Sequence, residues 1–76
     1  VLEVTTTKPA VQLYIGSFLV GCPNRTGGEY ANLAGFALET QFLPDSPNHP
    51  EWPQPSCILL PDQTYRHSTV YRLTAV

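Results

Sequence analysis

One carboxylate stands out because of the residues around it. Glu39 lies in the middle of an apolar segment that includes Phe36, Leu38, Phe42 and Leu43. An ionised carboxylate in such surroundings loses its hydration unless another group pairs with it or a reaction uses it. General bases need sites of this kind, because desolvation raises the pKa of a carboxylate toward working pH. Glu39 is therefore the candidate general base, and the alternative is a structural acid at a strand end or beside an arginine.

Three aromatic residues are candidates for stacking on a sugar ring. Tyr14, Tyr30 and Trp52 each offer an apolar face together with a polar edge, which suits the amphipathic surface of a sugar. The alternative for each of them is packing in a hydrophobic core. The sequence contains no Gly-rich phosphate loop, no Ser/His/Asp set and no closely spaced pair of carboxylates. This segment would therefore supply only part of any reaction.

The histidines and cysteines do not predict a metal site. His49, His67, Cys22 and Cys57 lack the C-x-x-C and H-x-x-x-H spacings that are typical of zinc ligands. We interpret His67 as a strand residue satisfied by a neighbour, and His49 as part of a loop or of a cleft lining. Two cysteines allow one disulfide by count, and nothing else in the sequence supports it.

Two alternating segments would position the polar side chains. Residues Ala10–Ile15 alternate between polar and apolar, which predicts a strand with Gln12 on the face opposite its aliphatic residues. This face must point toward water or a ligand cleft. The alternation resumes over Gly35–Leu43 and places Glu39 and Gln41 on one face. The candidate base thus lies on a strand with a second polar side chain beside it.

The remaining elements are also strands and loops. Val1–Thr7, Cys57–Leu60 and Thr64–Ala75 are predicted strands, and one face of the last of these is expected to be core. Gly21–Glu29 has the composition of an exposed loop, and Pro44–Pro53 is a longer loop that its prolines stiffen. No segment has a helical period, so the predicted fold class is all-β.

The composition indicates a piece of a larger domain. The chain has 76 residues, of which only 13% are charged against a typical value of about 25%. A free-standing domain would need more charged residues on its surface. The hydrophobic content of 42% argues against disorder. The chain also begins without Met, inside the strand-like run Val1–Val4. We therefore expect residues 1–76 to be part of one domain whose remainder covers some of this surface.

Charge and hydropathy exclude two classes of partner. The net charge is −2, so no basic patch is available to hold a nucleic-acid backbone. No apolar run approaches the roughly 20 residues that a membrane-spanning helix needs. We expect neither a nucleic-acid partner nor a membrane partner.

Five motifs follow one another along the chain. They are Thr7–Tyr14 (TKPAVQLY), Gly35–Gln41 (GFALETQ), Pro44–Pro50 (PDSPNHP), Leu60–Tyr65 (LPDQTY) and Ser68–Leu73 (STVYRL). This series, in register, resembles the C-terminal end of the aldose 1-epimerase family, also called galactose mutarotases. The resemblance covers essentially the whole chain.

The resemblance implies both a fold and a reaction. The family fold is a large antiparallel β-sandwich with an open cleft, and residues 1–76 would be its last strands. Members interconvert the α and β anomers of aldohexoses such as galactose and glucose without a cofactor. The glutamate of the Leu-Glu-Thr-Gln strand, here Glu39, is the general base, and Gln12 corresponds to a sugar-contacting glutamine. The resemblance further implies a cytoplasmic enzyme, with Pro44–Pro53 at the rim of the sugar cleft.

The resemblance also implies what these residues lack. The family's histidine acid belongs to a segment that precedes them, and neither His49 nor His67 matches its motif. The reaction needs both a general base and a general acid, so we expect the 76 residues alone to be inactive. Two alternatives remain: a non-catalytic sugar-binding or structural relative with the same sandwich, and a short protein that acts as an interaction module.

Overall fold

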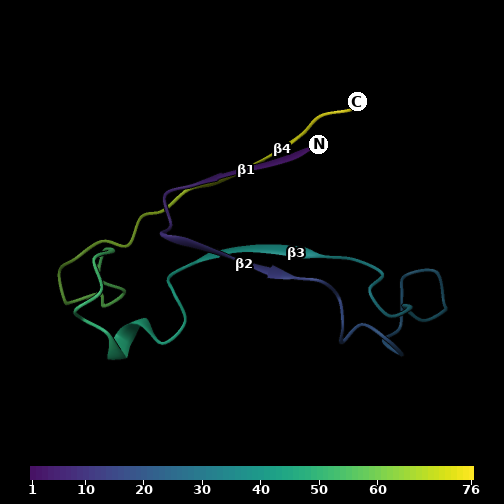
Figure 1. The fold of residues 1–76 in the computed structure, drawn as a ribbon, viewed down its shortest axis with the longest axis horizontal. Coiled ribbons are helices and arrows are strands. Elements are labelled where there is room, and N and C mark those ends of the chain that lie inside the picture. The colour runs from purple at the N-terminus through teal and green to yellow at the C-terminus, as the bar shows by residue number, and fades with distance from the viewer.

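The strands form two separate antiparallel pairs. The computed structural model describes all 76 residues, and β1 (Leu2–Thr6) pairs in it with β4 (Thr69–Leu73), while β2 (Ala10–Tyr14) pairs with β3 (Ala37–Gln41) (Figure 1). The helical content is one short 3-10 turn, η1 (Ser46–Asn48). The all-β prediction is therefore confirmed, and the antiparallel pairing agrees with strands of a β-sandwich.

The β1–β4 pair brings the two ends of the chain together (Figure 1). The Val1 ammonium group donates a hydrogen bond to the Thr74 carbonyl oxygen at 2.7 Å, and Glu3 faces Arg72 across the pair. The predicted end of the first strand at Lys8-Pro9 is confirmed, because β1 ends at Thr6 and the chain turns into β2. Proline has no amide hydrogen with which to continue the ladder.

Threonine hydroxyls and one tyrosine connect the two strand pairs. Thr69 Oγ1 lies 3.1 Å from Thr6 Oγ1 and 2.8 Å from Thr40 Oγ1, so it joins β1, β4 and β3. Tyr71 Oη donates to the Leu38 carbonyl oxygen at 2.9 Å. These bonds join β4 to β3 at Leu38 and Thr40, the neighbours of Glu39, and so hold in place the strand that carries Glu39.

A tight turn follows β2 and sets the start of β3. Gly16 has φ of 79°, and its carbonyl oxygen accepts hydrogen bonds from the Leu19 and Leu33 amides. A Cβ atom at Gly16 would lie 2.5 Å from the Gly35 carbonyl oxygen. Only glycine allows both this backbone conformation and this close approach.

Two predicted strands differ from the structure. Cys57–Leu60 is not a strand, because no segment pairs with it; its amides bond locally, Ile58 to Ser56 Oγ and Leu60 to Gln63 Oε1. The predicted strand Thr64–Ala75 is reduced to the five residues of β4, since β1 offers only five partners. An apolar composition favours a strand, but a strand forms only where a ladder partner exists.

The chain has no buried hydrophobic core. Gly16 is its one buried residue, and the radius of gyration is 16.7 Å, whereas a compact domain of this length would have about 11 Å. The expectation that one face of the last strand is core is therefore wrong for these residues: Tyr71 and Leu73 are 54% and 81% exposed. The aliphatic face of β2, which carries Val11 and Leu13, is exposed as well.

Candidate functional site

Gln12 and Glu39 are direct partners in the β2–β3 register. Residues that pair across an antiparallel ladder point to the same face, so the two side chains lie on one side of the sheet. Gln41 shares this face, and its Nε2 atom makes a long hydrogen bond of 3.5 Å to Gln12 Oε1. The prediction that Glu39 and Gln41 share a face is confirmed, and the structure adds Gln12 to the same group.

The environment of Glu39 differs from the expected one. Sequence reasoning placed this carboxylate in desolvated surroundings, but Glu39 is exposed in the structure, as is Gln12. The reason is the alternation of the strand: the apolar neighbour Leu38 points to the opposite face and does not cover the carboxylate. On this open face the Glu39 carboxylate can accept a proton, and the Gln12 carboxamide beside it can hydrogen-bond to hydroxyl groups.

An apolar hollow adjoins this polar face at its end nearest Tyr14. Tyr14 and Ala37 form the next pair in register on the same face, and both line a hollow of about 360 Å³ together with Leu19, Tyr30 and Phe36. The Tyr14 hydroxyl oxygen accepts a hydrogen bond from the Phe18 amide at 2.9 Å, which fixes the ring. Of the three predicted stacking candidates, Tyr14 and Tyr30 thus meet in one hollow.

The proline-rich loop contains a cluster of charged and aromatic groups around His49. The imidazole ring lies between two carboxylates, with Nε2 at 2.8 Å from Asp45 Oδ2 and Nδ1 at 2.9 Å from Glu51 Oε1. The Trp52 ring stacks on it, with ring centroids 4.1 Å apart and an angle of 3° between the planes. Trp52, the third stacking candidate, therefore packs on a histidine in this loop.

Titration of this cluster follows from its hydrogen bonds. The pKa of His49 is raised from its ordinary value of 6.5, first by the hydrogen bond to Glu51 and also by Asp45, while partial burial works in the opposite direction. The pKa of Asp45 is lowered by hydrogen bonds from Asn48 and His49, and the pKa of Glu51 is lowered mainly by His49. Each carboxylate and the imidazolium thus favour the charged form of the other.

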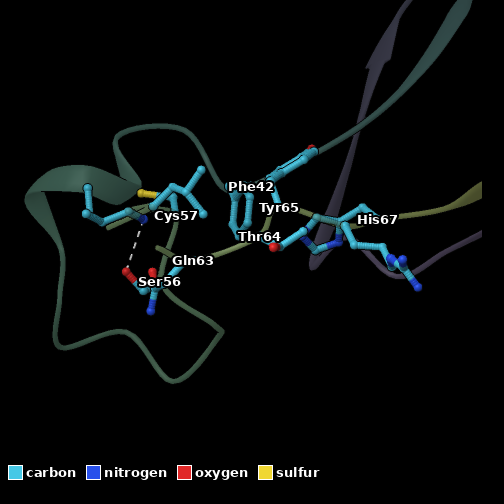
Figure 2. A pocket seen from close by; sticks show the side chains of 10 residues that line it. Phe42, Ser56, Cys57, Gln63, Thr64, Tyr65 and His67 are labelled. Atoms are coloured by element: carbon cyan, nitrogen blue, oxygen red, sulfur yellow. Dashed lines mark hydrogen bonds between the residues drawn. The ribbon is translucent and has the colours of Figure 1, made fainter. Parts of the chain in front are cut away.

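A second hollow, of about 400 Å³, lies between the 56–59 and 63–67 segments (Figure 2). Phe42 and Tyr65 lie close together in it, and the Lys8 ammonium sits over both rings, 4.5 and 4.4 Å from their centroids. His67 packs against the same two rings, and its Nδ1 lies 3.0 Å from Thr7 Oγ1. The expectation that a neighbour satisfies His67 is confirmed, although His67 precedes β4. Neither Gln12 nor Glu39 lines this hollow.

No group of three or more His, Cys, Asp or Glu side chains is arranged so that it could hold a metal ion. In the cluster around His49, the two carboxylates contact different nitrogen atoms of the imidazole ring. Cys22 and Cys57 are free thiols. No helix in the structure has both the length and the apolar character that a membrane span requires.

The fold and the site define an all-β segment that presents an acid and an amide on one sheet face. A family model described as "Aldose 1-epimerase" matches residues 1–72. The chain is 55% identical over 74 residues to an aldose 1-epimerase of Escherichia coli strain K12, and 43% identical over 75 residues to the galactose mutarotases of Rattus norvegicus and Homo sapiens. The chain belongs to the aldose 1-epimerase family.

The matches cover nearly all of this chain but only a small part of each relative. They include 97% of this chain but only 21% of each of these three relatives, so the chain spans about a fifth of their length. No solved structure matches the chain.

Sequence reasoning missed one feature beside the site and one outside it. The hollow beside Tyr14 brings together residues from separate segments, and no local pattern signals that meeting. The double contact of Lys8 with Phe42 and Tyr65 is likewise a product of tertiary structure. Gly16 carried a usable signal, since a glycine directly after a strand favours a turn with positive φ.

Proposed function

We propose that the chain is the C-terminal portion of an aldose 1-epimerase that interconverts the α and β anomers of hexoses such as galactose and glucose. The longer protein is called the parent protein below. The observation that carries the proposal is the cross-strand pairing of Gln12 with Glu39, in a chain that belongs to this family over nearly its full length. We further propose that the parent protein is cytoplasmic and uses no cofactor.

Each paired residue has a distinct role in this reaction. Glu39 is the general base that takes the proton from the anomeric hydroxyl group. A histidine acid elsewhere in the parent protein protonates the ring oxygen, so that the ring opens, the C1–C2 bond rotates and the ring closes on either face. Gln12 hydrogen-bonds to the sugar and holds it over the carboxylate. The proline-rich loop Pro44–Pro53 forms part of the rim of the cleft.

The remainder of the parent domain completes the site. The extended shape of the chain and the exposure of the aliphatic face of β2 support a covering layer on that side, as in a β-sandwich. That layer would lie on the face opposite Glu39, so the groups that complete the site must come from other parts of the parent domain. The 76 residues alone would therefore be inactive, because they contain the base without the acid.

A mutarotation assay on the parent protein tests this proposal. Freshly dissolved α-D-galactose changes its optical rotation slowly by itself, and an epimerase accelerates that change. Acceleration by the purified parent protein is the expected result. Sugar binding without acceleration would instead support a non-catalytic sugar-binding relative, and absence of both would support a structural role.

An interaction module is the competing proposal for the chain itself, and its physical state tests it. The absence of a buried core argues against an independent module. Circular dichroism and gel filtration on the 76 residues should show no cooperative unfolding. A compact monomer that unfolds cooperatively would contradict the proposal that the parent domain is needed.

A further inference from the structure

The apolar hollow beside Tyr14 is not explained by the acid–base roles of Gln12 and Glu39. Its lining is formed mostly by apolar residues, and its volume of about 360 Å³ falls in the range of small-molecule pockets, roughly 300–1,000 Å³. It opens beside the polar face rather than in a distant part of the chain, because Tyr14 and Ala37 belong to both.

The hollow lies at a defined distance from the candidate base. Tyr14 follows Gln12 by two residues on the same face, so the two positions are about 7 Å apart along the strand. One pyranose ring can bridge this distance. A sugar whose C1 hydroxyl lies at Glu39 can therefore reach the hollow with the opposite end of the molecule.

The chemistry of the two ends of the face favours this orientation. Toward Gln41 the face continues with a polar amide, whereas toward Tyr14 it continues with an aromatic ring and an apolar hollow. The C5–C6 end of an aldohexose carries hydrogen atoms on carbon that pack well on an aromatic face. Because the Phe18 amide holds the Tyr14 hydroxyl oxygen, the ring is fixed before a sugar arrives.

We propose that the hollow formed by Tyr14, Leu19, Tyr30 and Phe36 is the subsite for the C5–C6 end of the sugar, and that it makes the parent protein prefer hexoses over pentoses. This inference rests on the proposed function, since it takes the sugar to lie over Glu39. It adds a specificity-determining role for Tyr14, which would contact the exocyclic C6 carbon.

Three sugars of matched configuration test the subsite. D-galactose carries the full CH₂OH group, D-fucose keeps the C6 carbon without its hydroxyl group, and L-arabinose lacks the carbon altogether. In the parent protein, Tyr14→Ala should lower kcat/KM about tenfold for D-galactose and D-fucose, because one carbon in an apolar pocket is worth about that much selectivity. The value for L-arabinose should change by no more than about twofold on the same grounds.

Two further variants provide a second test of the hollow and a control. Leu19→Ala removes a second wall of the hollow and should reduce the hexose preference in the same direction, which protects the test if Tyr14→Ala fails to fold. Leu13→Ala is the control, because Leu13 lies on the opposite face of β2, and it should leave the ratio between the sugars unchanged. Equal losses for all three sugars, or unchanged ratios in both hollow variants, would overturn the proposal.

A binding measurement separates this proposal from the proposed function. Calorimetric titration of the parent protein with the three sugars reports the subsite whether or not the protein catalyses. If the protein binds sugars without isomerising them, tighter binding of D-galactose and D-fucose than of L-arabinose, abolished by Tyr14→Ala, would still support the subsite. Equal binding of the three sugars by the unaltered protein would refute it.

Discussion

Gln12 and Glu39 stand opposite each other across the β2–β3 pair, although a turn and a long loop separate them in the sequence. The pairing places an amide and a carboxylate side by side on one face, with no requirement for a rare backbone conformation at either residue. The pairing of β2 with β3 therefore determines where the Gln12 side chain lies relative to the Glu39 side chain. This relationship makes separable predictions about binding and catalysis.

Removal of the Gln12 amide should weaken sugar binding more than it slows the reaction. A hydrogen bond made in both the ground state and the transition state contributes mainly to KM. Gln12→Ala in the parent protein should raise KM for D-galactose about fivefold, which corresponds to the net value of one hydrogen bond. Steady-state polarimetry measures both constants, and Val11→Ala on the opposite face serves as the control. A fall in kcat with unchanged KM would assign Gln12 a different role.

The turn at Gly16 should be intolerant of any side chain. Gly16→Ala would place a Cβ 2.5 Å from the Gly35 carbonyl oxygen at a residue with φ of 79°, so it should lower the free energy of unfolding of the parent protein by about 3 kcal/mol. Gly21 has the same φ but nothing within 4 Å of the added atom. Gly21→Ala should therefore cost only the backbone term, about 1 kcal/mol. Equal losses in urea unfolding would show that the contact with Gly35 is unimportant.

The hydroxyl group of Thr69 should contribute to stability through its position between two other threonines. Thr69→Val removes the bonds to Thr6 and Thr40 and should lower the free energy of unfolding by about 1–2 kcal/mol. Thr5→Val, on the other face of β1, should change it by less than about 0.5 kcal/mol. Indistinguishable urea midpoints for the two variants would contradict the proposed link between the strand pairs.

The cluster around His49 should respond to pH in a predictable direction. A neutral imidazole donates through only one nitrogen, so contacts to both Asp45 and Glu51 require the protonated ring. Because the folded pKa of His49 is raised, its contribution to loop stability is fully present below pH 6.5 and is lost as the pH rises through the folded pKa. The lowered pKa values of the two carboxylates act in the opposite sense, and their contribution is lost in acid.

The titration of His49 can be followed directly by NMR of its ring. Glu51→Gln should lower the pKa of His49, because it replaces the carboxylate that contributes most to the raised value. Glu29→Gln, in an exposed loop outside the cluster, is the matched control and should leave the pKa of His49 unchanged. An unchanged pKa in the Glu51 variant would mean that the observed contacts do not govern the titration.

The sequence predicted the strands whose partners are in the chain. β1, β2 and β3 lie within their predicted segments, because alternation and proline positions determine them locally. The Cys57–Leu60 strand was predicted wrongly, since its apolar composition cannot reveal that no partner strand lies beside it. The register of the β2–β3 pair could not be predicted either, because nothing in the sequence near Gln12 indicates that Glu39 is its partner.

The candidate site was predictable in its residues but not in its environment. The polar face of β3 could be read from the alternation around Glu39. Its exposure in this chain could not, because burial depends on what covers a sheet face rather than on the strand itself. The hollow at Tyr14 depends in the same way on the 16–36 loop returning to β3.

The most direct test of the account is the mutarotation rate of the parent protein after Glu39→Gln. The substitution keeps the size of the side chain and removes its ability to take a proton, so kcat should fall by about 10²–10⁴ while sugar binding persists. Glu29→Gln controls for the loss of one negative charge and should retain full activity. An unchanged rate of α/β interconversion in the Glu39 variant would contradict the assignment of Glu39 as the general base.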